Sequence, residues 1–146
     1  MAQPAPAVLP EPLLRFLELF NAGAYWESHE VLEEPWRAQR SDFYQGLILY
    51  ASAFVHAQRG NPTGVRRQLA KVQQKLPPYL PYYLGIDVAG VLSTTERLLV
   101  WLDDHASPTG EALRRRFPFP SLSADPALMR GDEPELARGD EASPCG

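Results

Sequence analysis

Cysteine is almost absent from this 146-residue sequence, in which only Cys145 occurs. One cysteine cannot form a disulfide within the chain, so the fold needs no cross-link and a reducing compartment is expected. No apolar run approaches the roughly 20 residues that a membrane-spanning helix needs. The first twelve residues also lack the positive charge and apolar stretch of a secretion signal. These absences predict a cytoplasmic protein without a membrane partner.

Dense clusters of positive charge are scarce as well. The formal net charge is -4, and the only compact basic run is Arg114, Arg115 and Arg116. Nucleic-acid-binding domains carry a clustered basic face, so we expect no nucleic-acid partner. The sequence also contains no glycine-rich phosphate loop, no GxSxG motif and no CxxC pair. The common signatures of nucleotide-binding proteins, serine hydrolases and thiol oxidoreductases are therefore missing.

Proline, in contrast, is abundant, and its fifteen positions divide the chain. Residues 1–8 read as a disordered lead-in and residues 9–105 as one helical domain. Residues 106–146 are rich in proline and glycine and read as a mostly disordered tail, because they offer little apolar surface to offset the entropy of ordering. Phe117, Phe119 and Leu122 are exceptions, and the sequence leaves open whether residues 117–122 dock on the domain.

Apolar residues recur at helical spacing over most of the central part of the chain, and no strand-like alternation appears. Five helices are predicted, over about residues 11–21, 24–37, 42–59, 62–76 and 88–104. The third is apolar almost all round, which is typical of a central helix. The sequence therefore predicts an all-α fold, a compact bundle of about five antiparallel helices with disordered termini.

The ends of these helices carry local signals. Ser41 and Asp87 are suited to cap the third and fifth helices, because a short polar side chain can accept a hydrogen bond from the first turn. Gly60, Asn61 and Pro62 are suited to end the third helix and to begin the fourth, with Asn61 as its cap. Pro35 lies inside the second helix, where it removes a backbone hydrogen bond, so we expect a kink or an early stop there.

The densest group of polar and aromatic residues lies in the second helix. Residues three, four and seven apart share one face of a helix. Trp26, His29, Glu33 and Trp36 therefore fall on one side, with Glu30 at its edge. We expect this side to face the core, which places His29 and Glu33 between two tryptophans.

A buried carboxylate is costly unless it is paired or binds a metal. Glu33 has several candidate partners, which are His29, Arg37, Gln45, His56 or a cation. A satisfied hydrogen-bonded pair that holds two helices together is the simpler explanation. Glu27 belongs to the same polar group but points elsewhere.

The segment from His29 to Glu33 also reads HExxE, which differs from the HExxH zinc motif in its last residue. Carboxylates can bind zinc, iron or manganese, so His29 and Glu33 are candidate ligands. His56 is the candidate third ligand, and Glu30 is the candidate general base. Gln45 lies eleven residues before His56, roughly 16 Å along one helix, so the two cannot touch the same ion.

Several motifs together resemble a known family. FNAGAYWESHEVLEEPWR is followed by FYQGLI, by the histidine at position 56, by RGN at residues 59–61 and by LGID at residues 84–87. This combination, over about residues 16–102, is similar to the bacterial and archaeal domain-of-unknown-function 309 family. The resemblance implies a compact all-helical domain but no activity. The signature positions it implies are Glu27, His29, Glu30, Glu33, Trp36, Gln45, Gly46, His56, Gly60 and Asn61.

Two hypotheses about function follow. The first is a non-catalytic helical module that acts through self-association or partner binding, with His29 and Glu33 as a buried polar lock. The second is a metal-dependent, hydrolase-like enzyme with a divalent metal on His29, Glu33 and His56. The second predicts that these side chains converge on one point. We favour the first, in which the partner is either a second copy of the chain or another protein that the sequence does not identify.

Overall fold

The computed structural model describes residues 9–129, and within that range the regular elements are all helices, joined by loops with two isolated β-bridges at Ile86. The helices are α1 (Glu11–Asn21), α2 (Tyr25–Gln39), α3 (Asp42–Gln58), α4 (Pro62–Lys75), α5 (Val88–Asp104) and α6 (Gly110–Arg116), with 3-10 turns η1 (Pro77–Tyr79) and η2 (Pro126–Leu128). The predicted all-α class is confirmed. No helix in the described range is long and apolar enough to cross a membrane.

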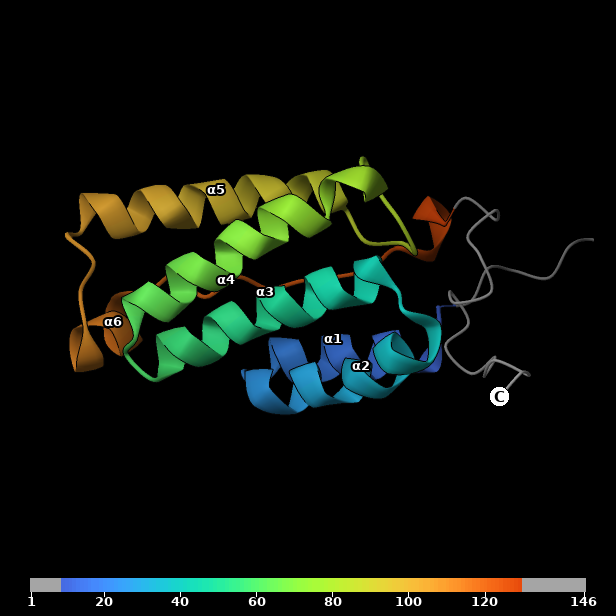
Figure 1. The fold of residues 1–146 in the computed structure, drawn as a ribbon, viewed down its shortest axis with the longest axis horizontal. Helices are drawn as coiled ribbons and strands as arrows, with labels where there is room; N and C mark the ends of the chain where they lie inside the picture. The colour runs from blue at the N-terminus through green and yellow to red at the C-terminus, as the bar shows by residue number, and fades with distance from the viewer. Residues whose placement is uncertain (1–8, 130–146) are drawn as a thin grey trace, which may run out of the picture.

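The helices follow one another back and forth through the domain (Figure 1). α1 and α2 form a pair that packs on one side of α3, and α4 packs on the other side. α5 lies against α4, away from the first pair, and α6 lies at the end where α3 turns into α4. α3 is therefore surrounded by other helices on most of its sides.

The sequence of α3 accounts for this central position. Its buried residues point in almost every direction around the helix: Phe43, Tyr44, Gly46, Leu47, Ile48, Tyr50, Ala51, Ala53, Phe54, Val55 and Ala57. Phe54 packs edge-on against Phe20 at 5.6 Å and against Tyr50 at 4.8 Å between ring centroids. Full burial of one such large side chain contributes roughly 1.5–3 kcal/mol. The aromatic cluster thus joins α1 to α3 at the centre of the core.

The predicted helix caps are confirmed. The Ser41 hydroxyl accepts a hydrogen bond from the Tyr44 amide at 3.1 Å. Asn61 Oδ1 accepts from the Gly64 amide at 3.1 Å, and Asp87 Oδ1 accepts from the Gly90 amide at 3.0 Å. Each cap satisfies a backbone donor that the first turn of a helix cannot satisfy itself.

Of the kink or early stop expected at Pro35, the early stop is wrong. α2 continues past this proline to Gln39 and ends where Arg40 adopts a left-handed conformation, with a φ of 53°. Proline removes one backbone hydrogen bond, but Pro35 itself is buried on the packed face of α2. Packing of that face offsets the lost bond and keeps the helix intact.

The chain beyond His105 is also structured, contrary to the boundary that the sequence predicts there. Leu113, Phe117 and Leu122 are buried, so residues 117–122 do dock on the domain. The Gly110 amide donates to the Gly60 carbonyl at 2.9 Å, which fixes α6 beside the α3–α4 turn. The predicted lead-in, residues 1–8, and the rest of the tail, residues 130–146, lie outside the described residues.

An extended segment then runs from α6 back along the domain to η2 (Figure 1). Asn21 Nδ2 donates to the Leu122 carbonyl at 2.6 Å, and the Leu122 amide donates to Asn21 Oδ1 at 2.8 Å. Further along, the Asp125 amide donates to the Gly85 carbonyl at 2.8 Å. We call residues 117–125 the C-terminal strap. It is attached to α1 and to the loop before α5.

Candidate functional site

The face of α2 that turns to the core is not the predicted one. Its buried residues are Tyr25, Ser28, Leu32 and Pro35. The spacing of Ser28, Leu32 and Pro35 matches one helical face as well as the tryptophan spacing does. Ser28 tolerates burial because its hydroxyl donates to the Tyr25 carbonyl at 2.8 Å. The predicted side is therefore rotated toward solvent, and Trp26 is 48% exposed.

The exposed ring of Trp26 is nevertheless held in place from two directions. The His29 ring stacks on it with 5.1 Å between centroids. The Arg59 guanidinium, from the end of α3, lies 5.6 Å from the Trp26 centroid. A cation at this distance from a tryptophan face is attracted by the ring quadrupole. Trp26, His29, Glu33, Arg37 and Arg59 form what we call the α2 strip.

Ionic contacts on the strip run along α2. His29 Nδ1 lies 3.6 Å from Glu33 Oε1, and Arg37 Nη2 donates to Glu33 Oε2 at 3.3 Å. The first distance is too long for a hydrogen bond, so the buried Nδ1 atom has no such partner. All three residues belong to one helix, so they cannot hold two helices together. The predicted buried lock is thus corrected to a partly exposed row of polar and charged side chains on one helix.

The remaining residues of the predicted polar group are spread around these helices. Trp36 is partly buried and packs against the core. Glu27 and Glu30 are exposed to solvent, and Gln45 is half-buried on α3. The candidate base Glu30 therefore lies on an open helix surface.

His56 faces the start of α4. Its Nδ1 atom lies 3.3 Å from Nδ2 of the Asn61 side chain. A Cβ atom at position 64 would lie 2.3 Å from the same Nδ1, so only glycine fits there. Burial, followed by the charges of Arg59 and Arg67, lowers the pKa of His56. These contacts favour a neutral imidazole that packs between two helices.

The three predicted metal ligands do not converge. Within residues 9–129, no group of three or more histidine, cysteine, aspartate or glutamate side chains is placed to hold a metal ion. His29 and Glu33 meet each other, whereas His56 meets Asn61 and Gly64. The convergence that the enzyme hypothesis requires is absent from the described part of the chain.

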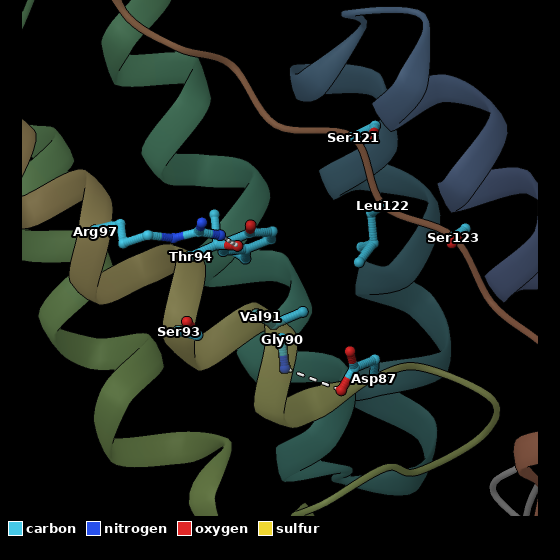
Figure 2. Close-up of a pocket in the computed structure, with 10 residues that line it drawn as sticks. Asp87, Gly90, Val91, Ser93, Thr94, Arg97, Ser121, Leu122 and Ser123 are labelled. Atoms are coloured by element: carbon cyan, nitrogen blue, oxygen red, sulfur yellow. Dashed lines mark hydrogen bonds between the residues drawn. The ribbon is translucent and has the colours of Figure 1, made fainter.

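A pocket that the sequence did not predict lies between α3, α5 and the C-terminal strap (Figure 2). Its volume is about 240 Å³, and its lining includes Tyr50, Thr94, Arg97 and Leu122. The residues come from three segments that are distant in sequence. The sequence does not single out Tyr50, because Tyr44 and Ser52 also carry hydroxyls within α3.

Comparison with known families confirms the resemblance over the first helices. Residues 13–68 match the family model described as Domain of unknown function (DUF309). No curated protein and no solved structure matches the chain. The DUF309 match contains the whole α2 strip, His56 and Tyr50. Arg97 and the C-terminal strap lie beyond it.

Proposed function

We propose that this helical domain is a non-catalytic module that associates with a second copy of itself through the α2 strip. The observation that carries the proposal is the state of Trp26. Its side chain is 48% exposed, yet it is fixed between His29 and Arg59. A large aromatic surface is therefore presented in one orientation, without the entropy loss that a mobile side chain suffers on binding.

The residue types of the strip suit a protein interface. Tryptophan and arginine are enriched among the residues that dominate binding energies. A buried tryptophan removes roughly 150–250 Å² of surface from water. Trp26 and Arg59 are thus the expected anchors, and Glu33 and Arg37 are expected nearer the rim.

The charges of the strip support a second copy as the partner. Arg37 and Arg59 are positive, and Glu33 is negative, while Glu27 and Glu30 add exposed negative charge on the same helix. In a two-fold dimer one patch faces itself, so a patch with both signs can place opposite charges against each other. A partner of one sign would leave half of these charges unmatched.

The test is the molecular mass of the full 146-residue chain in solution, measured by sedimentation from about 1 to 500 µM. We expect a concentration-dependent dimer. Trp26→Ala should weaken association by about thirtyfold or more, because truncating an anchor costs at least about 2 kcal/mol. Val100→Ala is the matched control, since Val100 is also an exposed apolar residue, at 51%, but belongs to α5.

A chain that stays monomeric over this whole range would contradict the proposal. Equal association of Trp26→Ala and Val100→Ala would contradict it as well, because the dimer would then use another surface. Circular dichroism of both variants checks that the helices remain folded.

A further inference from the structure

The hydroxyl of Tyr50 is the unusual feature of the pocket between α3, α5 and the C-terminal strap. Tyr50 is only 1% exposed, and its ring stacks against Phe20. Its hydroxyl has no hydrogen-bond partner among residues 9–129, although the side chain lines the pocket. The hydroxyl oxygen is open to the pocket, so water completes its hydrogen bonding in the free protein and a ligand group can take the place of that water.

Arg97 supplies a positive charge to the same pocket. Figure 2 shows its side chain extending from α5 toward the strap residue Leu122. Arg97 Nη2 donates to the Thr94 hydroxyl at 3.1 Å, and no carboxylate of the described residues pairs with the guanidinium. The Thr94 oxygen accepts this bond, so its own hydrogen stays available to donate. Arginine, threonine and tyrosine donors therefore line one pocket.

The rim of the pocket opposite Arg97 carries a negative charge and an apolar side chain. Asp87 lies there, with one carboxylate oxygen engaged by the Gly90 amide at 3.0 Å (Figure 2). Its negative charge disfavours a second anionic group at that end. Leu122 is buried and gives the strap side an apolar surface. The volume of about 240 Å³ is below the roughly 300–1,000 Å³ of sites for drug-sized ligands.

We propose that this pocket binds a small organic anion whose carboxylate or phosphate group contacts Arg97, Thr94 and the Tyr50 hydroxyl. The rest of the molecule is uncharged or positive, because it lies toward Asp87. Arginine is suited to this task, since its planar guanidinium donates two parallel hydrogen bonds to an oxyanion.

The protonation state of Tyr50 agrees with a donor role. Burial, and secondarily Tyr25, raise the pKa of Tyr50, and the nearby charge of Arg97 offsets this only in part. The hydroxyl therefore keeps its proton throughout the neutral pH range and can donate it to an anion.

The test is a nuclear magnetic resonance titration of the full chain with two probes, inorganic phosphate and acetate, at constant ionic strength set with sodium chloride. We expect saturable shifts of the amides of Thr94, Arg97 and Ser121 with at least one probe. Saturation by phosphate alone identifies a phosphate ligand, and saturation by acetate alone identifies a carboxylate ligand. Either result supports the pocket as an oxyanion site.

Three variants locate the binding. Arg97→Gln should raise the dissociation constant about tenfold or more, and Tyr50→Phe should raise it several-fold while the ring packing is kept. Arg116→Gln, on the exposed surface of α6, is the control that removes the same charge elsewhere. The proposal is overturned if neither probe saturates, or if Arg97→Gln and Arg116→Gln bind equally.

Discussion

The α2 strip and the pocket beside α5 are opposite kinds of polar region. The strip takes most of its residues from one helix, and its charged groups lie next to each other: Glu33 is within 4 Å of both His29 and Arg37. The pocket takes its residues from three segments, and the only charge on its Arg97 side, the guanidinium, donates to the Thr94 hydroxyl and pairs with no carboxylate of the described residues. The region that is richer in charge is therefore the one in which opposite charges already pair with each other.

This difference shows why polar density along a sequence is a weak guide to a binding site. Side chains three or four residues apart on a helix neutralise one another wherever that helix lies. A pocket lined by donors from several segments arises only when the fold brings those segments together. The two regions should consequently respond differently to mutation.

The largest expected effect lies in the core that supports both regions. Phe54 contacts Phe20, Tyr25 and Tyr50, and it also lies against the strap aromatics Phe117 and Phe119. Phe54→Ala should lower the free energy of unfolding by about 3–5 kcal/mol, because it leaves a cavity in packed surroundings. Urea unfolding measures this. A loss below about 1 kcal/mol would show that the aromatic cluster does not hold the domain together.

Asn21→Ala should loosen the strap side of the pocket and leave the α2 strip unchanged. It removes both hydrogen bonds to the Leu122 backbone, so we expect a loss of about 1–3 kcal/mol and faster hydrogen exchange of the Leu122 amide. Amides of α2 should keep their protection. Gln58→Ala is the control, because its amide makes one exposed hydrogen bond to Gly23. Equal exchange at Leu122 in the two variants would refute the attachment.

His56 should make the stability depend on pH. Burial, Arg59 and Arg67 lower its pKa in the fold from the ordinary value of 6.5, so the unfolded chain takes up a proton first as pH falls. This contribution to stability is complete above about pH 6.5 and is lost as pH falls through the folded pKa. Urea midpoints at about pH 7.5 and 5.5 should differ less in His56→Gln than in the wild type. Equal differences would contradict this account.

Glu33→Gln tests the strip as a source of stability. Its partners lie on the same helix and are partly exposed, so we expect a change of at most about 1 kcal/mol in urea unfolding. Glu111→Gln is the matched control, since Glu111 also pairs with two basic side chains on its own helix. A loss of about 3 kcal/mol confined to Glu33→Gln would restore the buried lock, because only a buried pair costs that much to break.

The smallest expected effect on stability is that of Tyr50→Phe. The hydroxyl has no partner in the described residues, so its removal breaks no hydrogen bond and should leave the free energy of unfolding within about 1 kcal/mol of the wild type. A clear destabilisation in urea would mean that the hydroxyl serves the fold rather than a ligand.

Much of the fold could be predicted from the sequence, because its signals are local. Ser41, Asn61 and Asp87 cap their helices through bonds that span three residues, so no distant contact decides them. The apolar run of α3 likewise predicts its central position. These features need only the neighbouring residues in the chain.

The candidate site was less predictable, because it depends on contacts between segments. Two faces of α2 have suitable spacing, and packing against α1 and α3 selects the one with Leu32 and Pro35. The hydrophobicity of Trp26 and Trp36 predicts that the other face is buried. The pocket requires Leu122 to lie near Tyr50 and Arg97, which no spacing in the sequence indicates. Proline content suggested a disordered tail, but Phe117 and Leu122 bury enough surface to order the strap.

The paired hydrogen bonds between Asn21 and Leu122 have a consequence for the order of folding. They join residues 101 positions apart, whereas the packing within the series α1, α2, α3 and α4 joins helices that follow one another in the chain. Closing a long loop costs entropy before its contacts reward it, so contacts between sequence neighbours form first. The strap should therefore attach last, onto helices already in place. The α2 strip would then exist in the earlier, partly folded chain, and the pocket only in the finished one.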